Sequence, residues 1–227
     1  MSLSIIIPTY NEAAAIGKLL GYLQQHISVT TELIVADGGS TDTTVTIAKQ
    51  AGAQVIVCWQ KGRSRQMNEA ASKASGQVLY FLHADTFPPV NFEQQIMQAI
   101  GMGYSSGCFR LRFDENHWFL QANAWFTRFN IDAIRFGDQS LFVRQHVFLE
   151  AGCFNDKLLL LEDQEIISRL KQKGRFKLVA DYVITSARKY REVGVYKLQA
   201  GYYLIFTLYK AGISQRRLLL LYKWLLR

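Results

Sequence analysis

Short apolar runs that alternate with helical patterns constrain the fold of this chain more than any other feature of its sequence. Four apolar runs cover residues 3–8, 32–36, 53–58 and 77–83. Helical patterns follow these runs at residues 16–23, 43–51, 65–75 and 90–100. This alternation predicts a parallel sheet with helices on both faces. The run 77–83 is almost continuously apolar, as is typical of a strand covered on both sides.

The second half of the chain is less regular. Strands are predicted at residues 108–113 and 176–179, with a short apolar stretch at 141–143. Helical patterns occupy residues 145–151, 164–173, 195–210 and 214–227. The aromatic residues between 118 and 129 fall partly at helical spacing, which predicts packing in the core or in a lid. We therefore expect one α/β domain with a helical C-terminal tail.

The charge of the chain is concentrated at its C-terminal end. The net charge is +8, yet residues 1–184 contain 17 basic and 17 acidic side chains. Residues 185–227 contain nine basic side chains and a single acidic one. Such asymmetry indicates an anionic surface or partner at that end, and a solvated basic helix is the open alternative.

Two further observations concern the cellular compartment. The three cysteines lie far apart without a CxxC pair, which favours a reduced protein over a disulfide framework or a zinc site. The most apolar uncharged stretch, residues 198–209, is shorter than the roughly 20 residues of a membrane-spanning helix. We expect a cytoplasmic protein, with peripheral attachment to the inner membrane face as an open alternative.

Carboxylates follow three of the predicted strands. Glu12, Asp37 and Asp85 lie just after the first, second and fourth apolar runs. Ligands of open parallel sheets bind beyond the carboxyl ends of the strands, so these side chains together indicate a site. Hard cations bind carboxylate and phosphate oxygens together, although each carboxylate alone is more typical of a turn. Neither GxxxxGK nor GxGxxG is present, which argues against a P-loop and a Rossmann dinucleotide site.

Five motifs occur along the first 165 residues in a recognisable order. They are IIIPTYNE (5–12), VADGGSTD (35–42), KGRSRQMN (61–68), LYFLHAD (79–85) and LLLEDQE (159–165). In this order and spacing they resemble the family-two glycosyltransferases, which have the GT-A fold. The details GRSRQMN, HADT, GDQSLFVR and TSAR resemble a small subgroup, radical-SAM/selenodomain-associated transferase 2, also labelled arsenosugar-biosynthesis glycosyltransferase.

The resemblance implies roles for individual residues. Asp163 matches the family's catalytic base, with Glu162 as the neighbouring alternative, and Asp85 matches the last acid of the DxD motif, which binds Mn²⁺ or Mg²⁺. Asp37 matches the acid that contacts the base or ribose. The remaining nucleotide-binding positions are Pro8, Tyr10, Glu12, Arg63, Asn68, His83 and Arg188.

This sequence departs from the family pattern at two places. His83 occupies the first DxD position, where it serves the ribose or a metal-bound water, or simply caps the strand end. Residues 187–191 stand where processive polymerases carry QxxRW, which argues against processive synthesis. Arg188 either contacts the diphosphate or lies in a solvated loop. Asp138 and Gln139 either contact the acceptor or cap a turn.

We therefore predict an inverting, non-processive glycosyltransferase of hexosyltransferase type with a mostly parallel GT-A sheet. Its donor is a UDP- or GDP-type sugar, and its acceptor is an unidentified hydroxyl. The transferase domain is expected at residues 1–190, and the basic amphipathic tail at 191–227 packs on the domain, on a second copy or on an anionic membrane. No nucleic-acid partner is expected. The alternatives are a sugar-phosphate nucleotidyltransferase and a basic module that binds a membrane or nucleic acid.

Overall fold

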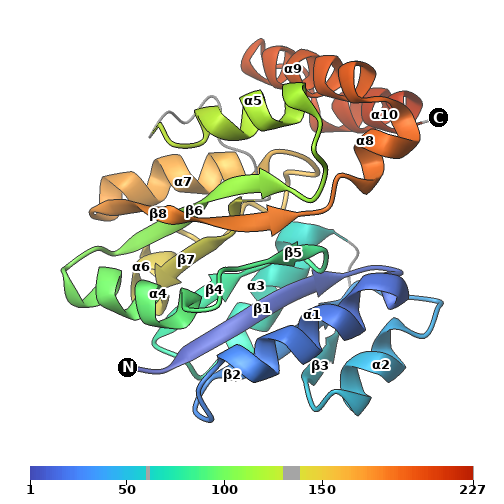
Figure 1. Cartoon of the computed structure of the whole chain (residues 1–227). Helices are drawn as coiled ribbons and strands as arrows, with labels where there is room; N and C mark the ends of the chain where they lie inside the picture. The colour runs from blue at the N-terminus through green and yellow to red at the C-terminus, as the bar shows by residue number, and fades with distance from the viewer. Residues whose placement is uncertain (60–61, 130–138, 227) are drawn as a thin grey trace.

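The computed structural model describes residues 1–59, 62–129 and 139–226, and eight strands within these ranges form one sheet (Figure 1). Their order across the sheet is β3-β2-β1-β4-β7-β6-β8-β5. Strands β5 and β7 run antiparallel to their neighbours, and the other pairs are parallel. The mostly parallel sheet is confirmed. The strands are β1 (Leu3–Thr9), β2 (Glu32–Asp37), β3 (Gln54–Val57), β4 (Val78–Phe81), β5 (Thr86–Phe87), β6 (Ser106–Phe113), β7 (Leu141–Arg144) and β8 (Phe176–Thr185).

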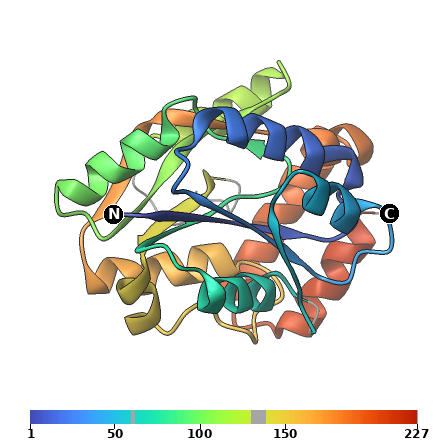
Figure 2. The same cartoon turned by 90° about the horizontal axis from the view of Figure 1, so that it is seen from below.

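Helices cover both faces of this sheet, as Figure 2 shows from below. Those of the first 150 residues are α1 (Ala13–His26), α2 (Thr44–Gln50), α3 (Arg63–Lys73), α4 (Phe92–Gly101), α5 (Trp118–Phe126) and α6 (Gln145–Glu150). Those of the remaining chain are α7 (Glu162–Lys173), α8 (Arg188–Val193), α9 (Val195–Lys210) and α10 (Gln215–Leu225). Helix α8 and the two-residue strand β5 have no counterpart in the sequence-based prediction.

Strand β1 supplies residues to two separate cores. Leu3, Ile5 and Ile7 pack on one face of the sheet, in a cluster shared with α1, α2 and α4. Ile6 points to the opposite face, in a cluster shared with α3, α6 and α7. Successive side chains of a strand alternate between faces, so a strand buried on both faces has to be apolar throughout. The continuous apolar runs in the sequence have this origin.

Strand β8 is longer than predicted, because an irregularity interrupts its apolar pattern. Its register with β6 shifts between Phe109 and Arg110, where pairing moves from Val179 to Tyr182. Asp181 lies within the skipped segment and accepts a hydrogen bond from Gln95 of α4 at 2.9 Å. A bulge breaks the two-residue alternation from which a strand is predicted. The pattern therefore stops at residue 179, although the strand continues to residue 185.

Helix α5 does not bury its large aromatic side chains. Leu120 and Ala124 are buried, whereas Trp118, Trp125 and Phe126 are exposed. Packing of these three residues in the core, which the helical spacing suggested, is therefore wrong. Small and aliphatic residues form the face that meets the domain.

The tail lies on the same side of the molecule as α5, where α8, α9 and α10 form one group (Figure 1). Leu198 of α9 is buried in a cluster with Leu120 and Tyr190. Gly201 allows α10 to approach α9 closely, because a Cβ there would lie 2.6 Å from the Cδ1 of Leu225. The expected boundary between residues 190 and 191 falls inside α8. No helix in the described part of the chain is long and apolar enough to cross a membrane.

Candidate functional site

A cavity of about 450 Å³ lies where the carboxyl ends of β1 and β4 meet the start of α7. Its volume is within the range of roughly 300–1,000 Å³ that is typical of small-molecule sites. Eight of the predicted site residues line it: Pro8, Glu12, Arg63, His83, Asp85, Glu162, Asp163 and Arg188. The fold thus brings together side chains from segments up to about 180 residues apart.

Helix α7 presents two adjacent carboxylates to this cavity. Glu162 and Asp163 are its first two residues, and Leu161 precedes them in a left-handed conformation with φ of 67°. The exposed backbone N–H groups at a helix start favour nearby negative charge. The backbone at this helix start accordingly acts to lower the pKa of Glu162, against the stronger effects described next.

Glu162 is the more deeply buried of the two, with an exposed fraction of 5%. Burial and the negative charge of Asp163 raise its pKa above the ordinary value. The guanidinium of Arg63 opposes this rise, since its Nη1 lies 3.6 Å from Oε1 of Glu162. Desolvation and the ion pair with Arg63 thus act on the pKa of Glu162 in opposite directions, and the net shift is upward.

Asp163 faces the residues that end β4. Its Oδ2 lies 4.0 Å from Nε2 of His83. Asp85, two residues after His83 in the sequence, lines the same cavity. The described residues contain no cluster of three or more histidine, cysteine or acidic side chains that could hold a metal by themselves. Mg²⁺ is commonly bound by one or two carboxylates together with substrate phosphates. Asp85 therefore fits a cation shared with a phosphorylated ligand rather than one enclosed by the protein.

An ion pair connects the first strand to the start of the tail. Nη2 of Arg188 lies 3.4 Å from Oε2 of Glu12, and both residues line the cavity. The loop alternative for Arg188 is wrong, because this residue begins α8. A guanidinium at this position is available to an anionic ligand on one side and to a carboxylate on the other.

Asp37 and Tyr10 do not line the cavity. Asp37 is buried and accepts hydrogen bonds from the backbone N–H groups of Gly39 and Ser40, at 2.9 and 2.8 Å. Its other oxygen accepts from the hydroxyls of Thr9 and Ser40. Asp37 therefore shapes the loop that follows β2, and its contact with a base or ribose stays a prediction. Tyr10 is half exposed.

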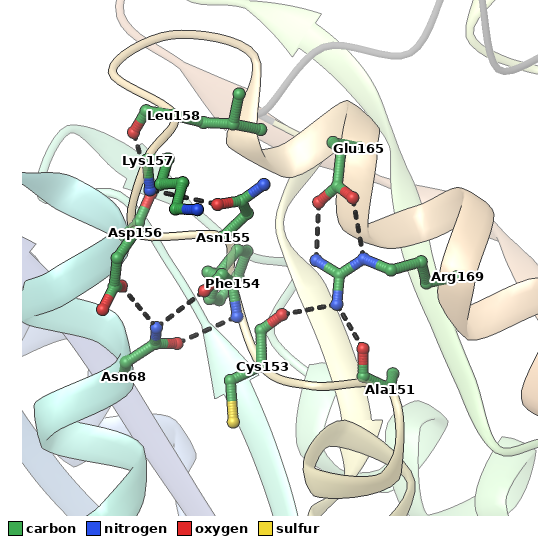
Figure 3. A network of polar contacts seen from close by, with 11 residues as sticks. Asn68, Ala151, Cys153, Phe154, Asn155, Asp156, Lys157, Leu158, Glu165 and Arg169 are labelled. Atoms are coloured by element: carbon green, nitrogen blue, oxygen red, sulfur yellow. Dashed lines mark hydrogen bonds and ion pairs between the residues drawn. The ribbon is translucent and has the colours of Figure 1, made fainter.

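Asn68 also lies outside the cavity, in the polar network of Figure 3. Its amide accepts from the backbone N–H of Phe154 at 2.9 Å and donates to the carbonyl of Phe154 and to Asp156, each at 2.8 Å. Arg169 of α7 pairs with Glu165 and donates to two carbonyls of the same loop. The network fixes the segment that leads into Glu162, so the structure gives Asn68 a positioning contact.

Of the two predicted acceptor residues, only Gln139 lies within the described part of the chain. Asp138 lies outside the described residues. Gln139 is buried and donates from Nε2 to the carbonyl of Phe109 at 3.3 Å, and it does not line the cavity. Contact of either residue with an acceptor stays a prediction.

The tail supplies cavity residues that the sequence reasoning missed. They are Gln199, Tyr202, Tyr203, Ile205 and Phe206 of α9 and Leu219 and Tyr222 of α10. Helical spacing along residues 198–209 indicated an apolar face, but spacing alone does not show what a face is turned towards.

Comparison with known proteins connects this geometry to a family. Residues 4–150 match the sequence family described as glycosyl transferase family 2. The chain belongs to this family. Membership makes it a glycosyltransferase, and the matched residues include the strand ends that carry Glu12, Asp37 and Asp85.

Curated relatives of this family member are glycosyltransferases as well. Glycosyltransferase AglE of Haloferax volcanii is 27% identical, over 98% of this chain and 79% of its own length. A PGL/p-HBAD biosynthesis glycosyltransferase of Mycobacterium bovis is 28% identical, over 84% of this chain and 77% of its own length. These identities are low, so they support the class of enzyme and leave the substrates open.

Solved structures of similar shape show the GT-A fold. The Pyrobaculum calidifontis mannosyltransferase PcManGT, in complex with GDP-Man and Mn²⁺, has a TM-score of 0.73 at 16% identity, over 92% of this chain. S. aureus TarS in complex with UDP-GlcNAc has a TM-score of 0.70 at 19% identity, over 82% of this chain. This family member spans 63% and 58% of those two chains.

Proposed function

We propose that this family member transfers a sugar from a UDP- or GDP-type donor to a hydroxyl acceptor in one inverting, non-processive step. The observation that carries the proposal is that Asp85 and Asp163 line one cavity at the carboxyl ends of the strands, together with His83, whose Nε2 lies 4.0 Å from Oδ2 of Asp163. The structures of PcManGT with GDP-Man and Mn²⁺ and of TarS with UDP-GlcNAc support a nucleotide sugar as the donor class.

The proposed reaction is a single displacement at the anomeric carbon of the donor sugar. The acceptor oxygen forms a bond to this carbon while the bond to the diphosphate oxygen breaks, so the configuration inverts. Asp163 accepts the proton of the attacking hydroxyl as a general base. Arg63 and Arg188, which line the cavity, interact favourably with the diphosphate, because guanidinium groups bind phosphate oxygens strongly.

Asp85 is the residue that would hold a divalent cation, with donor phosphates completing the coordination. A bound Mn²⁺ or Mg²⁺ supplies stabilisation of the charge on the leaving diphosphate. His83, which lines the same cavity, would orient a metal-bound water or the ribose. Nucleotide titrations in the presence of Mn²⁺ or of Mg²⁺ would show which cation the enzyme prefers.

The experiment that tests the proposal is nucleotide binding to the full chain with and without Mn²⁺. Thermal shift with UDP, GDP and their sugar conjugates should show a metal-dependent stabilisation by one base type. Asp85→Ala should abolish the metal-dependent part, because the diphosphate then meets Asp163 without a shared cation. Glu150→Ala is the matched control, since it removes an exposed negative charge on α6. Unchanged Mn²⁺-dependent binding in Asp85→Ala contradicts the assignment.

A further inference from the structure

The two helices of the tail form one wall of the cavity. Seven residues of α9 and α10 line it, and none of these seven carries a charge. The charged wall, formed by the other elements, carries Glu12, Arg63, Asp85, Glu162, Asp163, Arg188 and Lys189, of which Lys189 meets the tail at Tyr222. A nucleoside diphosphate needs the charged wall, because phosphate oxygens bind cations and guanidinium groups. The uncharged wall is therefore left for a different chemical group.

Contacts with the rest of the domain hold this wall in place. The hydroxyl of Tyr203 donates to Oδ1 of Asn123 in α5 at 2.8 Å. Nζ of Lys189 lies 3.4 Å from the hydroxyl of Tyr222 in α10, to which it donates. Leu198 is buried on the neighbouring surface of α9. The wall is thus joined to the domain from both helices.

Aromatic rings make this wall continuous. The ring of Tyr190 lies 5.3 Å from that of Phe113 and 6.2 Å from that of Tyr202, both in edge-to-face contact. Tyr202 in turn stacks on Tyr222 at 6.3 Å with an interplanar angle of 23°. Rings in such arrangements present large, rigid apolar faces with polar tips. Surfaces of this type bind flat rings or alkyl chains.

Gln199 contributes an unpaired donor to the same wall. Its exposed fraction is 2%, and its Oε1 accepts from the hydroxyl of Tyr190 at 2.8 Å. Its buried Nε2 has no hydrogen-bond partner among the residues that the structure describes. Buried polar groups nearly always have partners, so an orphaned amide beside a cavity indicates a ligand atom that accepts its hydrogen bond.

We propose that α9 and α10 form the acceptor subsite and that the acceptor is amphiphilic. Its hydroxyl meets Asp163, its apolar ring or chain packs on Tyr202, Phe206 and Tyr222, and a further oxygen accepts from Gln199. This assignment rests on the proposed function, since it takes the charged wall as the donor subsite. It adds the chemical class of the acceptor and the residues that select it.

The test compares three probes that share a sugar and differ in their apolar group: methyl, phenyl and octyl β-D-glucoside. Each is titrated calorimetrically into the full chain loaded with Mn²⁺ and the preferred nucleoside diphosphate, with octyl glucoside below its micelle-forming concentration. The phenyl or octyl probe should bind at least about tenfold more tightly than the methyl probe, which is about 1.4 kcal/mol. The phenyl and octyl arms distinguish an aromatic acceptor from an aliphatic one.

Variants in α9 test whether the wall formed by α9 and α10 causes the preference for the phenyl or octyl probe. Tyr202→Ala and Phe206→Ala should each lose most of the preference while keeping nucleotide affinity within about twofold. Leu204→Ala is the matched control, because Leu204 is exposed on the same helix and does not line the cavity. Retained nucleotide binding shows that a variant is folded. If Tyr202→Ala does not fold, Phe206→Ala alone tests the wall.

Two results overturn the inference while the proposed function stands. One is equal affinity for the three probes, including no binding of any, in a chain that binds nucleotide. The other is an apolar preference that survives in both Tyr202→Ala and Phe206→Ala. Failure of the unmodified chain to bind any nucleotide with Mn²⁺ overturns the proposed function, and this inference with it.

Discussion

Two neighbouring carboxylates at the start of α7 differ in their surroundings. The side chain of Glu162 pairs with Arg63 and is 6% exposed, whereas that of Asp163 faces His83 and is 15% exposed. A general base has to be ionised and able to reach its substrate. Asp163 meets this requirement better, because burial holds Glu162 closer to its protonated form. The environment of each residue thus supports Asp163, which the family resemblance also favours, over the adjacent Glu162.

Replacement of Asp163 by asparagine tests this distinction. Asp163→Asn keeps the shape of the side chain and removes the proton acceptor, so sugar transfer should fall by roughly 10²–10⁴-fold. Nucleotide binding should persist. Transfer is measured as product formed from the preferred donor, with Glu162→Gln made in parallel. Near-normal transfer by Asp163→Asn, together with loss in Glu162→Gln, would make Glu162 the base.

The raised pKa of Glu162 predicts a pH dependence of stability. The folded chain binds this proton more tightly than the unfolded chain, so the free energy of unfolding falls as pH rises from the ordinary glutamate pKa towards the raised one. The glutamine side chain of Glu162→Gln cannot ionise, so this variant does not show that fall in the free energy of unfolding. Its Tm should therefore rise relative to that of the unmodified chain as the pH is raised above about 4, the ordinary range of a glutamate pKa. Thermal melts measure this difference.

Exposed Glu150→Gln is the control for that measurement, since its side chain lies on the surface of α6. Its Tm difference should stay nearly constant over the same pH range. A constant difference for Glu162→Gln as well would show that the buried carboxylate does not titrate differently in the folded chain.

At the scale of elements, the close approach of β6 to its neighbours depends on a glycine. A Cβ at Gly107 would overlap the backbone carbonyl of Lys177 in β8 and the ring of Phe142 in β7. Backbone in a paired strand cannot move aside without breaking its ladder. The junction between the parallel and antiparallel parts of the sheet therefore requires the smallest residue at this position.

Two glycine substitutions with opposite outcomes test this requirement. Gly107→Ala should lower the free energy of unfolding by about 1–3 kcal/mol or more, because overpacked cores shift backbone and side chains. Gly21→Ala in α1 should raise it by about 0.5–1 kcal/mol, because an added Cβ there meets no atom of the described chain within 4 Å. Urea unfolding measures both. A neutral Gly107→Ala would contradict the packing described for β6.

At the scale of the whole molecule, the tail has two apolar surfaces. Leu218 and Leu225 of α10 are buried, Leu225 against Gly201 of α9, whereas Leu220 and Trp224 have exposed fractions of 63% and 64%. The exposed basic residues of this helix are Arg216, Arg217 and Lys223. Packing on the domain and contact with an anionic surface are therefore compatible, because they use different faces. We propose that the outer face of α10 meets an anionic membrane.

Sedimentation with lipid vesicles tests this proposal. The full chain should pellet with anionic vesicles at low salt, and high salt should release it by screening. The triple variant Arg216→Glu, Arg217→Glu and Lys223→Glu should lose this binding, since each basic residue near such a surface contributes about 1 kcal/mol. Lys18→Glu, Lys49→Glu and Lys157→Glu, combined, form the control of equal charge. No pelleting at low salt would make membrane recruitment wrong.

The local pattern of the sequence was enough to predict most of the elements and the core of the site. Buried strands such as β1 and β4 are continuously apolar because both faces are covered, and their carboxyl ends lie at one edge because they run parallel. Glu12, Asp37 and Asp85 could therefore be assigned to one site from the strand ends, and the family resemblance added Asp163. Of these four, Asp37 does not line the cavity. The periodicity of an element and the parallel direction of the strands can both be predicted from short stretches of the sequence.

Tertiary structure decided which groups actually share the cavity. Asn68 and Asp37 have the same residue types as ligand-binding groups, yet their hydrogen bonds go to a loop and to a turn. Conversely, Tyr202 and Tyr222 line the cavity although nothing in their helical spacing shows which surface they face. Such partners come from segments far apart in the chain. Their proximity depends on how the helices pack, and a local pattern contains no information about that distance.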